Sequence, residues 1–211
     1  GLVFCDDFNQ VAIDLTNDYE DTLGGTNDLC AISTTYPGGW VKFTCGDADN
    51  DLSHLATQLI FDISKNPVIE AKVLMTNVSG TSFYFGFSDA ITEAGMAATI
   101  DYKDATLVAT ATDAAGFVAD ADKISSLLYA ASIATGGAVG AASTGYTWVD
   151  NAVKTLRIEL KSDGDAHYYV DGVLKNIRQA AVTDVPLCAM FNWTQRAAEA
   201  NTTVFVDYLK Y

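Results

Sequence analysis

Three aspartates alternate in the stretch "GDADNDLSHL", at Asp47, Asp49 and Asp51. Acidic oxygens at every second position could bind Ca²⁺, because calcium prefers several carboxylate and carbonyl ligands and calcium loops open with this spacing. The stretch then departs from such a loop, since Leu52 stands where a glycine is needed and Gln58 where a glutamate is needed. A weak calcium site and a solvated acidic loop are therefore both open, and no other metal or cofactor is indicated.

Paired carboxylates are a second chemistry to consider, because glycoside hydrolysis needs two acids a few ångströms apart. Side chains two residues apart on a strand point to the same face. On that spacing Asp101 shares a face with Lys103, and Arg157 with Glu159, but no strand carries two or three alternating acids. The sequence therefore predicts no catalytic residue, and an enzyme would need an acid pair that only the folded chain brings together.

A nucleophilic mechanism needs a base, and the chain has only two histidines, His54 and His167. No G-x-S-x-G motif accompanies them, so both are expected to be structural or surface residues. Phosphate-binding loops are absent as well. The neighbouring Tyr168 and Tyr169 would point to opposite faces of a strand, so they could not form one stacking platform for a ligand.

Composition narrows the class of protein. Hydrophobic residues make up 49% of the 211 residues and charged residues 18%, which is enough to bury a substantial core. A formal net charge of -15 repels nucleic acid and anionic membranes, so no binding to either is expected. The uncharged run between Lys123 and Asp150 is rich in small residues, which argues against a transmembrane helix. The N-terminal stretch shows no signal-peptide pattern.

The four cysteines are Cys5, Cys30, Cys45 and Cys188. Their spacing contains no C-x-x-C pair, so a zinc site is not expected. Reduced, mostly buried thiols are one interpretation, and a bridge between Cys30 and Cys45 is the other.

The dominant pattern along the chain is a period-two alternation of apolar and polar residues, which is typical of half-buried strands. It is clearest in "TLRIELKSDGDAHYYVDGVLK", where Leu156, Ile158 and Leu160 alternate with polar neighbours. The "SDGD" segment and the "DG" of Asp171 and Gly172 are turn sequences. This stretch therefore predicts two consecutive antiparallel hairpins that form scaffold and not a binding site.

Many short strands separated by turn residues predict an all-β fold, an antiparallel β-sandwich, in a single domain over residues 1–211. Short helices are expected around residues 91–98 or 194–200. The predicted strands besides the two hairpins are residues 40–45, 56–63, 68–76, 82–89, 114–120, 125–133 and 202–211, and the Ala/Thr-rich stretch 105–115 is expected to form a strand and a turn.

The hairpin stretch resembles the paired hairpins of concanavalin A-like (laminin G and glucanase) jelly rolls, in which a Y-x-D/N-G turn recurs. "FCDDF" near the start and "VFVDYLKY" at the end resemble the paired terminal strands of that fold. The order "FYFGFSDA", "DAAGFVADAD", "LLYAASI", "TLRIEL" and "YYVDGVL" further resembles a group of tailed-bacteriophage head proteins, from about Phe83 to Tyr211. A concanavalin A-like jelly roll is thus the expected fold.

The resemblance implies a non-enzymatic virion protein, synthesised in the host cytoplasm, that decorates or cements the outside of a phage capsid. The implied partners are the major capsid protein and copies of the chain itself in a homo-oligomer, with a glycan on the host surface as a further ligand. Glucanases of the same fold carry an E-x-D-x-x-E strand motif that this sequence lacks, so no hydrolase activity is implied. The alternative hypothesis is a lectin-like carbohydrate-binding module, since fold does not fix function.

Overall fold

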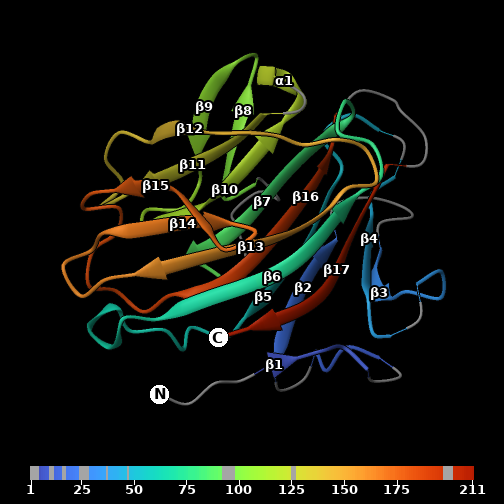
Figure 1. Ribbon diagram of the computed structural model, residues 1–211, viewed down its shortest axis with the longest axis horizontal. Helices are drawn as coiled ribbons and strands as arrows, with labels where there is room; N and C mark the ends of the chain where they lie inside the picture. The colour runs from blue at the N-terminus through green and yellow to red at the C-terminus, as the bar shows by residue number, and fades with distance from the viewer. Residues whose placement is uncertain are drawn as a thin grey trace.

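The computed structural model describes residues 5–9, 12–15, 18–23, 29–36, 38–46, 48–91, 98–124, 127–196 and 202–211. Two antiparallel sheets pack face to face, and a separate two-stranded hairpin stands near α1 (Figure 1). The helical elements among the described residues are short, namely η1 (Ile63–Lys65) and α1 (Ala121–Ile124). The predicted all-β, antiparallel sandwich is therefore confirmed.

One sheet has eight strands in the order β15-β14-β13-β6-β17-β4-β3, with β1 paired to β17. Cys5 lies opposite Lys210 in that last pairing, which confirms the predicted pairing of the terminal strands. The strands of this sheet are β1 (Cys5–Asp6), β3 (Leu29–Ile32), β4 (Val41–Thr44), β6 (Val68–Met75), β13 (Val153–Leu160), β14 (Ala166–Val170), β15 (Val173–Arg178) and β17 (Thr203–Lys210).

The other sheet has seven strands in the order β12-β11-β10-β7-β16-β5-β2. Consecutive strands are often not neighbours, because the chain crosses repeatedly between the two sheets, as it does in jelly rolls. The strands of this sheet are β2 (Tyr19–Leu23), β5 (Leu52–Thr57), β7 (Thr81–Ser88), β10 (Ala114–Asp120), β11 (Leu127–Ile133), β12 (Gly140–Thr147) and β16 (Cys188–Gln195). The separate hairpin consists of β8 (Ile100–Lys103) and β9 (Thr106–Ala109).

The two hairpins predicted from the alternating stretch are formed by β13, β14 and β15. The apolar residues of β13 face the core, and its charged residues lie half-exposed on the outside. Tyr168 is fully buried and its hydroxyl donates to the Ala131 carbonyl on the facing sheet at 2.8 Å. Tyr169 lies on the outside, where the Arg157 guanidinium stacks over its ring. The interpretation of this stretch as scaffold is therefore consistent with its position.

The core between the sheets is built from aromatic rings. Phe85 of β7 stacks on Phe191 of β16, with ring centroids 4.8 Å apart. Phe117 of β10 makes an edge contact with Tyr168 of the opposite sheet at 5.2 Å, so this pair joins the two sheets. Offset and edge-to-face contacts of this kind stabilise a core beyond simple burial of area.

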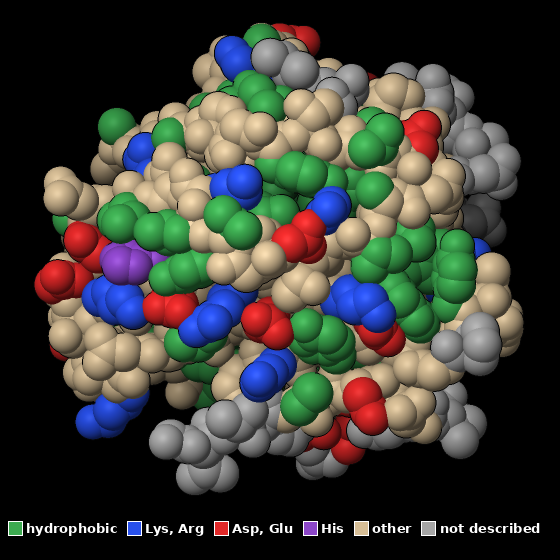
Figure 2. All heavy atoms as spheres, viewed as in Figure 1, with side chains coloured by type: hydrophobic (Ala, Val, Ile, Leu, Met, Phe, Trp, Pro, Cys, Tyr) green, Lys and Arg blue, Asp and Glu red, His purple; other side chains and the backbone are tan. Residues whose placement is uncertain are grey.

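The outer face of the eight-stranded sheet is a mixture of charges, and Figure 2 shows basic and acidic side chains interspersed across it. Lys72 pairs with Asp207 at 2.5 Å and also lies over the Trp40 ring. Lys161 pairs with Glu159 at 2.6 Å. Exposed pairs of this kind contribute little to stability individually, so this face is best described as solvated scaffold.

Strand β15 forms an edge of the eight-stranded sheet, because it pairs only with β14. Three of its apolar side chains are exposed, with Val173, Leu174 and Ile177 at 56%, 45% and 47% of their accessible surface. The pairing with β14 shifts register between Tyr168 and Tyr169, so a bulge interrupts this edge.

Several elements differ from the sequence prediction. The strand predicted at residues 56–63 begins earlier, at Leu52, and ends at Thr57. The end of the predicted range belongs to η1, which Asp62 caps by accepting a hydrogen bond from the Ser64 amide. Strands β2, β3, β8, β12 and β16 were not predicted. The predicted helix at 194–200 is wrong for Thr194 and Gln195, which end β16, and its remainder past residue 196 lies outside the described residues, as do residues 92–97 of the other predicted helix.

None of the four cysteines, all of which the structure describes, forms a disulfide, so the alternative of a bridge between Cys30 and Cys45 is not realised. Burial raises the pKa of the Cys30 thiol, which keeps it protonated. In the described part of the chain, no helix is both long and apolar enough to span a bilayer.

Candidate functional site

The β8–β9 hairpin packs on the outer face of the seven-stranded sheet, the face turned away from the other sheet. Among the strands that the structure describes, its two strands pair only with each other. They are joined by a tight turn in which Asp104 and Ala105 have positive φ values of 48° and 65°, as type I′ turns require. Ile100 and Tyr102 of β8 are buried in an apolar cluster that includes Tyr84, Val118, Tyr129, Ala131, Cys188 and Met190 of the sheet.

Two glycines make this face of the sheet flat. Gly86 and Gly116 lie opposite each other on β7 and β10. A Cβ atom on Gly116 would lie 2.3 Å from the Tyr84 ring, so no larger residue fits there. The Tyr84 ring rests against this position and its hydroxyl donates to the Phe87 carbonyl at 2.6 Å.

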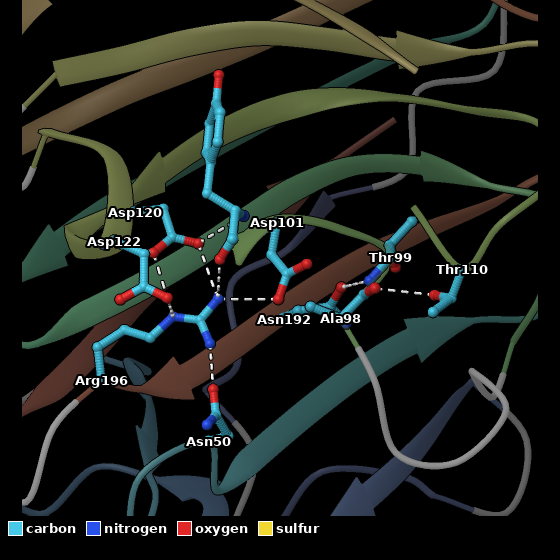
Figure 3. Close-up of polar contacts among 10 residues, drawn as sticks. Asn50, Ala98, Thr99, Asp101, Thr110, Asp120, Asp122, Asn192 and Arg196 are labelled. Carbon is cyan, nitrogen blue, oxygen red and sulfur yellow. Dashed lines mark hydrogen bonds and ion pairs between the residues drawn. The ribbon is translucent and has the colours of Figure 1, made fainter. Parts of the chain in front are cut away.

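Arg196, which directly follows β16, contacts the acidic side chains of this region (Figure 3). Arg196 donates from Nε to Asp120 Oδ1 at 3.1 Å and from Nη2 to Asp120 Oδ2 at 2.9 Å. These two parallel bonds are the fork geometry in which guanidinium and carboxylate bind most strongly. Asp120 is the last residue of β10, so the fork joins the ends of two strands of the same sheet.

The hairpin is attached to the same arginine. Nη2 of Arg196 also donates to Asp101 Oδ2 and to the Tyr102 carbonyl, both at 2.8 Å. The Tyr102 amide in turn donates to Asp120 Oδ2 at 2.9 Å. The side chain of Asn50 accepts a bond from Nη1, and Asp122 Oδ2 lies 3.8 Å from Nε.

The charges of this cluster are unbalanced, because one guanidinium faces three carboxyl groups. Burial raises the pKa of Asp101, and the hydrogen bond from Arg196 offsets this only in part. Burial also raises the pKa of Asp122, and the neighbouring Asp120 raises it further. Burial alone would lower the pKa of Arg196, but the hydrogen bonds and charges of Asp120 and Asp101 outweigh it, so Arg196 stays protonated.

Asp101→Asn is expected to be less stable than the wild type near pH 4, and this difference in free energy of unfolding is expected to shrink as the pH rises to about 7. Since the pKa of Asp101 is raised in the folded state, its carboxyl contributes stability that is present below its ordinary pKa of 3.8 and is lost as the pH rises through the raised value. Asparagine has the same shape and cannot ionise. Urea unfolding of both proteins across this pH range measures the difference in free energy of unfolding.

The matched control for this prediction is Asp171→Asn, which must show the opposite slope. Burial would raise the pKa of Asp171, but the hydrogen bond and charge of Lys154 lower it overall. Its contribution is therefore present above the ordinary pKa of 3.8 and lost as the pH falls. Parallel slopes for the two variants would contradict the assignment of a raised pKa to Asp101.

A second polar group lies further along the same sheet face. Asn192 Oδ1 accepts a bond from the Thr99 amide at 2.8 Å, where the chain enters β8 (Figure 3). His54 stands opposite Asn192 on β5 and is fully buried. Neither ring nitrogen of His54 has a hydrogen-bond partner, and the same holds for Oγ1 of Thr194. Burial lowers the pKa of His54 to about 4, so the ring is neutral at physiological pH. Buried polar atoms without a protein partner are unusual and can receive a polar ligand.

The structure places two of the predicted calcium residues, Asp49 and Asp51, in the turn that also carries Asn50, but the described residues do not complete a metal site. Asp49 is exposed and Asp51 half-buried in the turn before β5, and Asp47 lies outside the described residues. Among the residues that the structure describes, no group of three or more His, Cys, Asp or Glu is arranged to hold a metal ion. The calcium hypothesis stays a prediction.

Sequence reasoning missed Arg196, Asp120 and Asp122. The useful signal was the spacing of Asp120 and Asp122 two residues apart at the end of a predicted strand, "GFVADAD". Strand β10 ends at Asp120 and the helical turn α1 begins at Ala121, so the pair does not lie on one strand face. Arg196 gave no signal, because it is 76 residues from Asp120 and 95 from Asp101 along the chain.

The same fold occurs in solved structures of polysaccharide-cleaving enzymes. The chain is similar to a β-glucanase of Bacillus licheniformis, with a TM-score of 0.64 and 14% identity over 100% of this chain and 98% of the other. It is similar to the laminarinase catalytic domain of Thermotoga maritima, with a TM-score of 0.67 and 14% identity over 100% and 96%. A β-1,3-1,4-glucanase (lichenase) derived from a mouse hindgut metagenome gives 0.67 and 13% over 99% and 98%.

No protein-family model matches the chain, and no curated protein matches it. At these low identities the similarity shows the fold, which is the concanavalin A-like jelly-roll β-sandwich of glucanases, as the hairpin stretch predicted.

The similarity to glucanases corrects two predictions made from the sequence. The interpretation as a phage capsid decoration protein is wrong, because the neighbours in structure are glucanases and laminarinases. The prediction of a non-enzymatic protein is wrong for the same reason. It rested on the missing strand motif of acids, whereas the folded chain brings Asp101 and Asp120 together from separate elements. The virion location and the capsid partner were inferred from the same resemblance, and both stay predictions.

Proposed function

We propose that the protein is a glycoside hydrolase that acts on a neutral polysaccharide, with Asp101 and Asp120 as its two carboxyl groups. The observation that carries the proposal is that these side chains meet at Arg196 on the outer face of the seven-stranded sheet. The fold that holds them is shared with β-glucanases.

The spacing of the two carboxyl groups supports this assignment. Each places an oxygen within 2.9 Å of the same nitrogen, so these oxygens are at most about 6 Å apart, a limit that admits the roughly 5–5.5 Å spacing of retaining glycosidases. The environments of the two groups also differ. Burial raises the pKa of Asp101, as a general acid requires, while Asp120 is held by the Arg196 fork, as a carboxylate requires.

The proposed reaction has two steps. Asp101 donates its proton to the glycosidic oxygen as the bond to the anomeric carbon breaks, and Asp120 bonds to that carbon. Water next attacks the same carbon and gives its proton back to Asp101, and Asp120 leaves as the carboxylate. Arg196 holds the charge of Asp120 between these steps.

The charge of the protein restricts the substrate. With a formal net charge of -15, the surface repels polysaccharides that carry uronic acid or sulfate groups. The buried, unpartnered nitrogens of His54 and the Thr194 hydroxyl would instead pair with the hydroxyl groups of a neutral sugar.

A carbohydrate-binding module without hydrolysis is the second candidate. It is favoured by one observation, that Arg196 already engages both carboxyl groups and that their side chains are only 6% and 0% exposed. A protein with this arrangement could hold a glycan on the sheet face and leave its bonds intact.

Incubation with laminarin and with mixed-linkage β-1,3-1,4-glucan, followed by measurement of reducing ends, tests the proposal. The wild type is expected to release reducing sugar, and Asp120→Asn to lower kcat at least about a hundredfold, since positioned acids and bases contribute roughly 10²–10⁴. Asp101→Asn provides an isosteric second variant in case Asp120→Asn does not fold.

Asp184→Asn is the matched control, because Asp184 is an exposed aspartate with no contact to the cluster. If the protein is retained on a glucan affinity gel but releases no reducing sugar, the result rejects the hydrolase and supports the carbohydrate-binding module. Neither retention nor release on either glucan would overturn both candidates.

A further inference from the structure

The two carboxyl groups come from different layers of the molecule. Asp120 ends a strand of the seven-stranded sheet, whereas Asp101 belongs to the β8–β9 hairpin, which shares no ladder hydrogen bond with either sheet. In this structure the hairpin is closed, and neither side chain is accessible to a polymer, with 6% and 0% exposed. A substrate can therefore reach the two carboxyl groups only after a local rearrangement, and Asp101 moves with the hairpin that carries it.

The contacts at Arg196 are unequal. The fork to Asp120 uses Nε and one proton of Nη2, and both groups belong to the rigid sheet. Nη2 has two protons, yet three acceptors lie within 2.9 Å of it: Asp120 Oδ2, Asp101 Oδ2 and the Tyr102 carbonyl. Two protons are therefore shared among three acceptors, and two of these acceptors belong to the hairpin.

The remaining attachments of β8 near the turn are side-chain contacts. The Tyr102 amide donates to Asp120, and Lys123 of α1 lies over the Tyr102 ring at 5.6 Å from its centre. At the other end of the hairpin, the Thr99 amide is held by Asn192, and the Thr110 amide donates to the Thr99 carbonyl. The polar contacts thus hold the hairpin at its base through Asn192 and at its tip through the charged cluster, and the buried side chains of Ile100 and Tyr102 pack on the sheet between them.

We propose that the β8–β9 hairpin is a lid that opens at its tip and that its closing assembles the carboxyl pair, with Arg196 as the positioning residue that receives Asp101. This inference rests on the proposed function for the roles of the two acids, but the motion itself does not. Opening breaks the bonds from Arg196 to Asp101 and Tyr102 and the bond from the Tyr102 amide to Asp120, and it leaves the fork from Arg196 to Asp120 intact. Closing over a bound glycan then returns Asp101 to the reaction centre and excludes water.

Native-state hydrogen exchange of the full chain tests the motion without any glycan. In the wild type, the amides of Asp101, Tyr102 and Lys103 are expected to exchange through an opening at least about tenfold more frequent than that of the β10 amides. Asp101→Ala is expected to raise exchange in β8 and β9 by a further factor of about ten and to leave β10 and β7 unchanged.

Lys103→Ala is the matched control, because Lys103 is an exposed residue of the same strand and makes no contact with Arg196. Less than a twofold change at the hairpin amides is expected for it, as for surface substitutions generally. If the hairpin and β10 amides exchange together in the wild type, or if Asp101→Ala accelerates both equally, the hairpin is an ordinary part of the core and the lid is overturned.

Adding mixed-linkage β-1,3-1,4-glucan to the same samples separates the two proposals. Slower exchange at β8 in the presence of the glucan links the lid to the substrate. Local opening of the hairpin combined with no glucan hydrolysis and no glucan binding would leave the lid in place and remove the proposed function. Cleavage of the glucan by the wild type without local opening of the hairpin would keep the proposed function and remove the lid.

Discussion

Arg196→Met is expected to lower the free energy of unfolding by about 3–5 kcal/mol at neutral pH, because it leaves two carboxyl groups buried without a countercharge. The side chains of Asp120 and Asp101 are only 0% and 6% exposed, so water cannot replace the guanidinium. Methionine keeps most of the volume of the arginine stem, which limits the loss of packing. Urea denaturation at equilibrium measures the change.

Lys154→Met is the control for this prediction. Lys154 pairs with Asp171 at 2.6 Å, but its partner's side chain is 46% exposed, and such pairs contribute about 1 kcal/mol or less. A loss for Arg196→Met no larger than that for Lys154→Met would mean that the cluster is hydrated and that Arg196 is not its central cation. Adding Asp101→Asn and Asp120→Asn to Arg196→Met should recover part of the loss, because the uncompensated charges are then removed.

Phe117→Ala is expected to cost about 3–5 kcal/mol of unfolding free energy. Phe117 is fully buried in the middle of β10, and its ring meets Tyr168 of the opposite sheet edge-on at 5.2 Å. Removing the ring leaves a cavity at the join between the two sheets, which neighbouring side chains can fill only in part. Thermal and urea unfolding both report the loss.

Tyr169→Ala is the control for this core substitution, because Tyr169 is the immediate neighbour of Tyr168 but lies on the outer face under Arg157. Its loss is expected to be about 1 kcal/mol or less, as for most surface positions. Equal losses for the two variants would mean that the sheets are not joined through Phe117 and Tyr168.

The strands that alternate apolar and polar residues could be predicted from the sequence. The clearest cases are β13 and β14, because each buries one face against the facing sheet and leaves a recognisable pattern. Strand β16 could not be found this way. All of its residues are buried, since the sandwich core covers one side and the hairpin region the other, so its side chains do not alternate.

The candidate site escaped prediction for a different reason. Its acids belong to β8, to the end of β10 and to the start of α1, and they are held together by an arginine far away in sequence. A search for alternating acids on one strand assumes that one element carries the pair. Here the pair arises from the packing of two layers, and only the tertiary contacts reveal it.

The edge strand β15 has a practical consequence for handling the protein. Its row of unpaired backbone groups and its exposed Leu174 and Ile177 offer a template on which another chain could add a strand. Two features oppose this: the bulge in β15, and the mutual repulsion of molecules that each carry a formal net charge of -15. Salt screens that repulsion within a few ångströms at high ionic strength. Concentrated stocks should therefore keep best in dilute buffer well above the isoelectric point.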